Sequence, residues 1–295
     1  MKIEQLVLKN QKNFELKDIF ECGQCFRWKQ EANGSYTGVV KVGVINVNKK
    51  GKDIIIKGYV DGRCDFENFC NDYFNLSCNY EKIQKCISKD DNVMKQAIHF
   101  GNGIRILNQD NFEMLISYII SAANNIPRIS KCISNISCKY GKKVTISKKE
   151  SLGLFEVEET REYYLFPSAD SLSDATLEEL RNCNLGFRDK YVLENAKKVA
   201  SGELNLNTVE QMDYKIAKKE LTKLNGVGDK VADCILLFSM KKHEAFPVDT
   251  WIKKIMNETY VDSKNVKKIN EYAENKWGEN AGIAQQYLFY YKREN

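Results

Sequence analysis

The stretch that decides the fold is residues 223–234, which read KLNGVGDKVADC. Apolar residues recur at helical spacing on both sides of its glycines: Ala217, Leu221 and Leu224 before them, and Val231, Ile235 and Phe238 after them. The glycines interrupt this pattern, because they favour turns rather than helix interiors. The sequence therefore predicts two packed helices, at 213–224 and 229–240, joined by a tight turn.

The turn at Gly226 and Gly228 has two interpretations. Glycines let a backbone approach a ligand closely, and the free amides at the start of the second helix form a site suited to a phosphate. A Gly-x-Gly sequence between helices is also a common tight turn without a ligand. The turn alone leaves both readings open.

Lys230 occupies an unusual position, in the first turn of the second predicted helix. A cation there lies against the positive end of the helix dipole, where an acidic residue is preferred. The same field, together with partial burial, favours an uncharged amine that can act as a nucleophile. The alternative is that Lys230 extends into solvent with no chemical role.

Asp249 follows in the sequence Phe246-Pro247-Val248-Asp249-Thr250-Trp251. Its carboxylate can cap a helix over residues 250–260. A capping carboxylate held by backbone amides is expected to stay ionised, so it can also stabilise positive charge that develops opposite it.

Helical periodicity is also found on both sides of the hairpin. Further helices are predicted at 175–182, 189–200 and 281–291. The clearest helix follows Asp110, whose side chain can cap the amides of Phe112 and Glu113, and its apolar face extends to Ala123. We expect a stop at 124–127, because Pro127 disfavours helical geometry at the residue before it.

Residues 1–60 have the signals of an antiparallel sheet. Asn33-Gly34 lies between two strand-like runs, and residues 42–47 and 53–56 form a second pair interrupted at 48–51. The sequence predicts an α+β protein with two parts. A small amino-terminal antiparallel β domain with flanking helices spans 1–105, and a larger all-α domain spans 106–295 and carries the hairpin at about 213–240. The lysine-rich stretch 139–149 is expected to be an exposed connection.

Composition limits the classes of protein to which the chain can belong. It has 295 residues, 43% hydrophobic, with 45 Lys and Arg against 40 Asp and Glu, a formal charge of +5. This balance suits an anionic partner but is less basic than a protein held to nucleic acid by charge alone. Ten cysteines without a signal sequence indicate free thiols in a reducing compartment. We expect a soluble, cytoplasmic protein, associated with the nucleoid if it is prokaryotic, and a monomer.

Zinc is not expected, since the chain has one CxxC, at Cys22 and Cys25, and two histidines.

The segments 225–234 and 247–249 resemble the helix-hairpin-helix and Pro/Val-Asp signature of DNA glycosylases, and specifically the 8-oxoguanine DNA glycosylases similar to the eukaryotic enzyme. Further segments resemble this family in the same order along the chain: Gly-Gln-x-Phe-Arg-Trp at 23–28, Asn-Asn-Ile-x-Arg-Ile at 124–129, Leu-Gly-aromatic-Arg at 185–188, and Trp-Gly…Ala-Gln…Leu-Phe at 277–289. Together they span nearly the whole chain.

The resemblance implies a base-excision-repair enzyme that flips the damaged base out of duplex DNA. Lys230 would attack C1′ and form a Schiff base, which makes β-elimination of the 3′ phosphate possible, while Asp249 would stabilise the developing sugar cation. The family therefore implies both N-glycosylase and AP lyase activity. No metal is expected for the chemistry, although a structural monovalent cation at the hairpin carbonyls is implied.

The resemblance also assigns the base pocket and the DNA contacts. The Gly23 carbonyl would accept the N7 proton that distinguishes 8-oxoguanine from guanine, Cys234 and Phe289 would sandwich the base, and Gln285 would contact its Watson–Crick edge. The expected DNA-binding residues are Asn124, Asn125, Arg128, Phe187, Arg188, Gly226, Gly228 and Trp251.

Three positions depart from the family pattern. Ala123 replaces a third asparagine, Phe187 replaces the usual wedge tyrosine, and Trp251 replaces a histidine that contacts phosphate. Arg128 and Arg188, which the family uses on the opposite cytosine, are retained. Because the rest of the opposite-strand contact is lost, we expect a relaxed preference for the base opposite the lesion.

Three rival functions would require different residues from those in this sequence or a different use of them. A glycosylase for alkylated bases would keep Asp249 but would not need Lys230. An endonuclease III-type enzyme would need clustered cysteines for an iron–sulfur cluster, and no cysteine follows Cys234. A DNA-binding module without enzymatic activity would use the hairpin only for phosphates, so that Lys230 and Asp249 would be dispensable.

Overall fold

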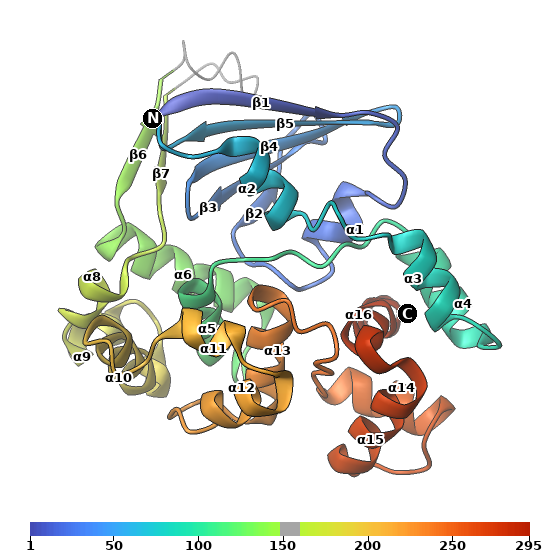
Figure 1. Cartoon of the computed structure of the whole chain (residues 1–295). Coiled ribbons are helices and arrows are strands. Elements are labelled where there is room, and N and C mark those ends of the chain that lie inside the picture. Colours follow the sequence, from blue (N-terminus) through green and yellow to red (C-terminus); the bar gives the residue numbers. More distant parts are fainter. Residues whose placement is uncertain (148–159) are drawn as a thin grey trace.

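The amino-terminal part of the chain forms a twisted antiparallel sheet in a computed structural model that describes residues 1–147 and 160–295 (Figure 1). The sheet has the order β1-β5-β4-β3-β2, with strands β1 (Lys2–Leu8), β2 (Trp28–Gln30), β3 (Tyr36–Val40), β4 (Gly43–Lys50) and β5 (Asp53–Val60). The predicted β2–β3 hairpin is confirmed, with Gln30 paired to Tyr36. The predicted break at 48–51 is wrong in part, since β4 continues to Lys50 and the chain turns at Gly51, whose φ is +62°.

The two faces of the sheet pack against different partners. One face alternates buried side chains along β5, including Ile54, Ile56 and Val60, and packs on α1 (Leu16–Phe20) and α2 (Phe66–Tyr73). The other face packs through Val44 on a separate two-stranded sheet formed by β6 (Lys143–Ile146) and β7 (Arg161–Tyr164).

The β6–β7 pair corrects part of the expectation for stretch 139–149. Val144 and Ile146 are buried in β6, while Lys143 and Thr145 between them are exposed. Residues 148–149 of that stretch lie outside the described residues.

The remaining described chain is helical, which confirms the α+β class. Its elements are α3 (Tyr80–Ile87), α4 (Asn92–Phe100), α5 (Asn111–Ser121), α6 (Ile126–Tyr140), α8 (Ala169–Ser173), α9 (Leu177–Asn182), η1 (Gly186–Arg188), α10 (Asp189–Ala200), α11 (Leu206–Gln211), α12 (Tyr214–Leu221), α13 (Asp229–Ser239), α14 (Thr250–Thr259), α15 (Val266–Trp277), η2 (Gly278–Asn280) and α16 (Ala281–Glu294). Helices α3 and α4 pack in the same core as α16, which lies beside them in Figure 1.

Helix α5 lies in the centre of this helical core. The Asp110 carboxylate caps it as predicted, accepting hydrogen bonds from the amides of Phe112 and Glu113 at 3.0 Å. It ends at Ser121, but Pro127 is not the stop signal that we expected. Pro127 lies in the first turn of α6, where its missing amide hydrogen has no helical acceptor to lose.

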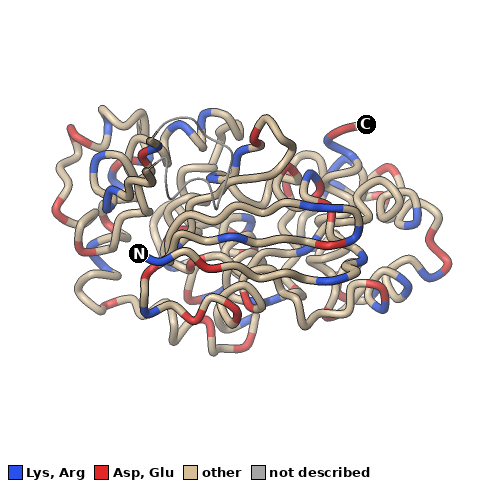
Figure 2. Tube along the Cα trace, turned by 90° about the horizontal axis from the view of Figure 1, so that it is seen from above, with Lys and Arg blue, Asp and Glu red and all other residues tan. Residues whose placement is uncertain are grey.

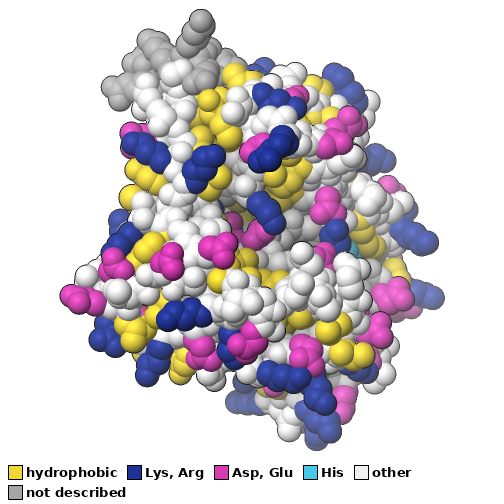
Figure 3. Space-filling model, turned by 60° about the vertical axis from the view of Figure 1, so that its left-hand side comes forward, with side chains coloured by type: hydrophobic (Ala, Val, Ile, Leu, Met, Phe, Trp, Pro, Cys, Tyr) yellow, Lys and Arg dark blue, Asp and Glu magenta, His cyan; other side chains and the backbone are white. Residues whose placement is uncertain are grey.

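Basic and acidic residues are intermixed in both views of charge. Figure 2 shows Lys and Arg and also Asp and Glu scattered along the trace, and both signs are interspersed on the face shown in Figure 3. Within the described ranges, no helix is both long and apolar enough to cross a membrane.

Candidate active site

The predicted hairpin is formed by α12 and α13, with a turn that requires glycine at one position. Gly226 has φ +85°, and a methyl group there would lie 3.0 Å from the ring of Tyr191. Gly228 caps α13 with extended backbone, so that no side chain covers the first amides of the helix. These features fit a backbone that approaches a ligand closely.

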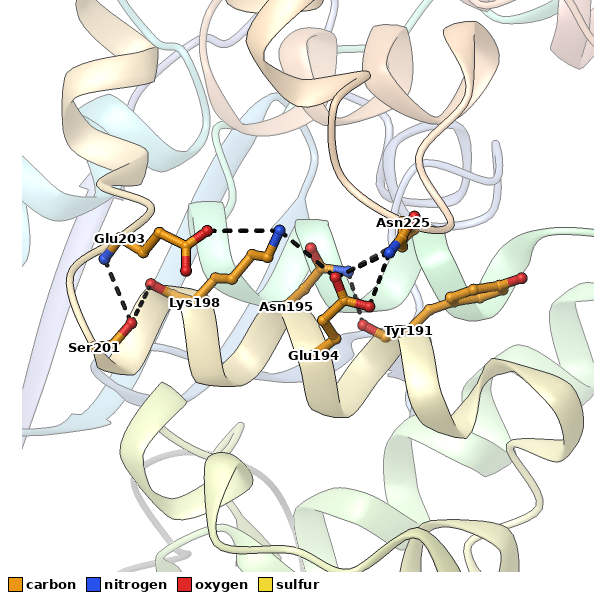
Figure 4. Close-up of polar contacts among 7 residues, drawn as sticks. All are labelled: Tyr191, Glu194, Asn195, Lys198, Ser201, Glu203 and Asn225. Atoms are coloured by element: carbon orange, nitrogen blue, oxygen red, sulfur yellow. Dashed lines mark hydrogen bonds and ion pairs between the residues drawn. The ribbon is translucent and has the colours of Figure 1, made fainter.

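Helix α10 fixes the turn from one side through polar contacts (Figure 4). The Asn195 amide nitrogen donates to the Asn225 carbonyl at 2.9 Å, and the Asn225 side chain donates to Glu194 at 2.9 Å. Lys198 lies 3.5 Å from Glu194 and 3.6 Å from Glu203. The turn is therefore held in place before any ligand arrives.

A buried polar cluster joins the two helices of the hairpin. Asp233 accepts hydrogen bonds from Lys218 Nζ at 2.7 Å and from the Tyr214 hydroxyl at 2.8 Å. Burial raises the pKa of Asp233, while Lys218 opposes this shift. The cluster fixes α13 relative to α12 and so fixes the direction of the residues at its amino terminus.

Lys230 lies in the first turn of α13 and is half-buried. Its Nζ lies 5.5 Å from the ring centroid of Tyr118, a buried residue of α5. Tyr118 stacks on Phe238, and its hydroxyl donates to the Gln24 carbonyl at 3.3 Å. Sequence patterns did not point to Tyr118, because its one signal was an aromatic residue within an aliphatic helix face.

Asp249 caps α14 as predicted, accepting a hydrogen bond from the Ile252 amide at 2.8 Å. Its pKa is nevertheless raised, because burial disfavours the charged form more than the backbone amide and the nearby charge of Lys230 favour it. The expectation that capping alone keeps this carboxylate ionised omitted the effect of burial.

Cys234 lies one turn after Lys230 on α13, close enough for the charge of Lys230 to affect its thiol. Burial raises the pKa of this thiol to about 11, although Lys230 lowers it. The thiol is therefore neutral at physiological pH. The fold thus brings together Lys230, Cys234 and Asp249, as the sequence predicted.

The loop that carries Gly23 lies against the carboxyl-terminal helix α16. Gly23 has φ +91°, and a methyl group on it would lie 3.1 Å from the ring edge of Phe289. The Gln286 side chain donates to the Cys22 carbonyl at 2.8 Å and links α16 to this loop. Gln285 is 4% exposed, and its Oε1 has no hydrogen-bond partner among the residues that the structure describes.

Gln24 fixes this loop, a role that the sequence analysis missed. Its amide nitrogen donates to the carbonyls of Ile19 and Arg105 at 2.9 and 2.8 Å. Its Oε1 accepts from the Leu107 amide at 2.9 Å. Two of these partners, Arg105 and Leu107, lie more than eighty residues from Gln24 in the sequence. Only the place of Gln24 beside Gly23 in the motif at 23–28 could therefore have indicated this role.

The loop between α5 and α6 presents the predicted asparagines. Asn125 caps α6 by accepting from the Arg128 amide at 3.0 Å, and Asn124 donates to the Ile120 carbonyl at 3.1 Å. The side chain of Arg128 is exposed. Phe187 is 59% exposed on η1, and Trp251 is exposed at the start of α14.

Arg188 differs from these residues because it is 4% exposed. Its guanidinium donates to the carbonyls of Ala122 at 2.9 Å and Ala123 at 3.0 Å, and it lies 4.3 Å from the ring centroid of Phe187. In this structure Arg188 therefore connects η1 to the α5–α6 loop.

Two further observations concern metals and thiols. Residues 1–147 and 160–295 hold no group of three His, Cys, Asp or Glu side chains that could bind a metal ion. All ten cysteines are free.

Comparisons with known proteins match the chain over most of its length. A family model described as "8-oxoguanine DNA glycosylase, N-terminal domain" matches residues 6–115, and one described as "HhH-GPD superfamily base excision DNA repair protein" matches residues 116–279. The N-glycosylase/DNA lyase OGG1 of Arabidopsis thaliana is 32% identical over 92% of this chain and 75% of its own. A probable N-glycosylase/DNA lyase of Methanothermobacter thermautotrophicus is 35% identical over 70% of this chain and 69% of its own.

A solved structure gives a similar result. The Clostridium acetobutylicum 8-oxoguanine glycosylase/lyase, in complex with double-stranded DNA containing cytosine opposite 8-oxoguanine, is 45% identical with a TM-score of 0.90. The alignment covers 100% of this chain and 98% of that one.

Proposed function

Because the chain belongs to the 8-oxoguanine DNA glycosylases of the helix-hairpin-helix superfamily, we propose that it excises 8-oxoguanine from duplex DNA and then cleaves the strand at the abasic site. The observation that carries this proposal is the position of Lys230. Its amine lies at the start of α13, beside Cys234 and Asp249, as part of a hairpin that is already fixed by α10.

Lys230 acts as the nucleophile. After Nζ has given up a proton, it forms a bond to C1′ while the bond from C1′ to N9 breaks. The electron pair of that bond leaves with the base, which takes up a proton. Loss of the amine proton and opening of the sugar ring give a Schiff base between Lys230 and C1′. Removal of a C2′ proton then expels the 3′ phosphate and cuts the strand.

Asp249 and Cys234 have different roles beside this amine. The Asp249 carboxylate stabilises the positive charge that develops on the sugar, since a fixed charge in a partly buried site acts more strongly than one in water. Cys234 is a neutral thiol and neither competes as a nucleophile nor holds the amine as an ion pair.

The base pocket lies between Phe289 and Cys234, with Gly23 at its edge. The Gly23 carbonyl accepts the N7 proton of 8-oxoguanine, which guanine lacks, so guanine would set a lone pair against a carbonyl oxygen. The Gln285 Oε1, which has no hydrogen-bond partner in the described part of the chain, is a suitable acceptor for the donors on the Watson–Crick edge.

DNA is held by backbone amides and a few side chains rather than by a large basic surface. The turn at Gly226 and Gly228 presents the first amides of α13 to a phosphate, with a monovalent cation at the turn carbonyls. Asn124 and Asn125 help to fill the vacated stack and contact the opposite strand together with Arg128. Trp251 contacts the DNA backbone, and the exposed Phe187 is the wedge that enters the stack.

Trapping with borohydride tests this proposal. Duplex DNA containing 8-oxoguanine is incubated with the protein and borohydride, which reduces a Schiff base to a stable covalent adduct. We expect an adduct with the wild type and none above background with Lys230→Gln.

Lys223→Gln is the matched control, because Lys223 is exposed on the same turn and paired with Glu220 at 2.6 Å. It should be trapped like the wild type. DNA binding by the wild type without any adduct would instead indicate a binding module without enzymatic activity.

A further inference from the structure

Arg293, near the end of α16, has a buried hydrogen-bond donor that the protein does not use. The side chain is 16% exposed, and within the described ranges its Nη1 has no hydrogen-bond partner. Its other nitrogens are used, since Nε donates to Glu294 at 2.8 Å and Nη2 donates to the Glu21 carbonyl at 2.6 Å. A buried cationic donor without an acceptor is costly, so it indicates a partner that is absent from the free protein.

The free Nη1 points to the wall of the proposed base pocket. A methyl group on Gly23 would lie 2.7 Å from Nη1, and the guanidinium carbon lies 5.3 Å from the ring centroid of Phe289. Arg293 therefore touches both residues that border the base on this side. Its bond to Glu21, two residues before Gly23, holds the guanidinium in this place.

The chemistry of the damaged base supplies a suitable acceptor. In 8-oxoguanine the N7 proton lies between two carbonyl oxygens, O6 and O8. A base whose N7–H donates to the Gly23 carbonyl places one of these oxygens on each side of that bond. We propose that Arg293 donates from Nη1 to a carbonyl oxygen that flanks N7, and so helps to determine which base is excised.

This inference rests on the proposed function and adds a selective contact to it. Adenine has an amino group at C6 and no oxygen at C8, so in this pocket it would leave the Arg293 donor unpaired. A site built around a donor rejects a base that lacks the matching acceptor, because the desolvated donor is then left without a partner.

Arg293→Met tests the proposal, because it removes the donors while keeping an unbranched apolar stem. We expect excision of 8-oxoguanine to fall about tenfold to a hundredfold, the usual loss for a hydrogen bond from a charged donor. Strand cleavage at a preformed abasic site should stay within about twofold, since no base is present there. Arg293→Lys keeps the charge without the planar fork, and we expect it to recover excision only in part.

Lys292→Met is the matched control. Lys292 precedes Arg293 on the same helix, carries the same charge and is paired with Glu258 at 2.8 Å. It should leave both activities within about twofold, which separates the loss of one positive charge near the DNA from the loss of the Arg293 fork. Thermal unfolding of each variant establishes that the fold is kept.

Three results would overturn the inference. Arg293→Met excising as fast as the wild type would mean that the donor is unused, and faster excision would mean that the guanidinium blocks the pocket. An equal loss in both assays would assign Arg293 to the fold or to DNA binding. Failure of the proposed function is distinct, because the wild type would then cleave neither substrate.

The two oxygens can be distinguished by binding. With Lys230→Gln, which cannot react, affinity is compared for 8-oxoguanine and guanine duplexes, with and without Arg293→Met. A reduced preference for 8-oxoguanine identifies O8, which only the oxidised base has. An unchanged preference together with slower excision by the Arg293 single variant identifies O6.

Discussion

Gly23 is constrained both by its own backbone conformation and by the side chains that surround it. Its φ of +91° is costly for other residues, and a methyl group there would lie 2.7 Å from Arg293 and 3.1 Å from Phe289. We predict that Gly23→Ala lowers the free energy of unfolding by about 1–2 kcal/mol and strongly reduces excision of 8-oxoguanine. Denaturant unfolding and single-turnover excision measure the two effects.

Gly34→Ala is the control for this prediction. Gly34 has a similar φ of +81°, and apart from its chain neighbours no described residue would lie within 4 Å of an added methyl group. It should lose comparable stability and keep full activity. Equal activity of Gly23→Ala and the wild type would show that the pocket does not use this wall.

Asp249 is a residue at which function and stability are opposed. Burial raises its pKa above the usual 3.8, so its stabilising contribution is present below that pH and is lost as pH rises through the folded-state pKa. We predict that Asp249→Asn, which can still cap α14, is more stable than the wild type at pH 7. Excision should fall about a hundredfold or more because the stabilising charge is lost.

Melting temperatures of both proteins across a range of pH test the sign. The difference should shrink as the pH approaches the acidic range in which Asp249 becomes protonated. A variant that is less stable at pH 7 would show that attraction to Lys230 outweighs the cost of burial.

A helix or strand could be predicted from the sequence only where its own residues carried enough local signal. Helix α10 was predicted with both ends correct, because its periodicity extends over twelve residues. Strand β6 was missed, since two buried residues, Val144 and Ile146, are too few to distinguish a strand from a lysine-rich loop. The α5–α6 boundary was found, but Pro127 was assigned to the wrong side of it.

The α12–α13 hairpin is expected to depend on its buried ion pair. Lys218 is the ionic partner of the buried Asp233, so Lys218→Met leaves an uncompensated buried carboxylate. We expect a loss of about 3 kcal/mol at pH 7. The loss should be smaller at acidic pH, because the pKa of Asp233 is already raised by burial and protonation removes the charge.

Lys215→Met provides the comparison on the same helix, since Lys215 pairs with Glu274 at 2.8 Å in a mostly exposed position. It should cost less than about 1 kcal/mol. Equal losses for the two variants in urea unfolding would contradict the role assigned to the buried pair.

For the whole molecule, the site lies where the two main cores meet. Cys22 packs in the helical core and Cys25 in the sheet core, so the loop between them carries Gly23 across the junction. Sequence patterns could place Lys230, Cys234 and Asp249 because they belong to one hairpin and the helix cap that follows. They could not place Gln24 or Arg293, whose partners come from distant segments. They also did not reveal that Arg188 is buried against Ala122.

The proposed contacts to the damaged base and to the opposite strand come from different segments, which leads to a prediction about the base opposite the lesion. The proposed base pocket is built from the Gly23 loop, α13 and α16, whereas the residues proposed to contact the opposite strand come from the α5–α6 loop and η1. Ala123 lies in that loop at φ +49° and supplies no polar side chain. We predict that excision rates opposite cytosine, adenine, guanine and thymine differ by less than about tenfold, which is at the low end of the discrimination that one good bidentate pair of hydrogen bonds provides.

Ala123→Asn tests the cause, because asparagine tolerates a left-handed backbone better than alanine does. The variant should keep its melting temperature or raise it slightly, and its excision should shift in favour of cytosine by about tenfold. The measurement is single-turnover excision with each of the four opposite bases. A strong requirement for cytosine in the wild type would mean that Arg128 and Arg188 suffice to contact the opposite strand, and that Arg188 leaves the carbonyls of Ala122 and Ala123 when DNA binds.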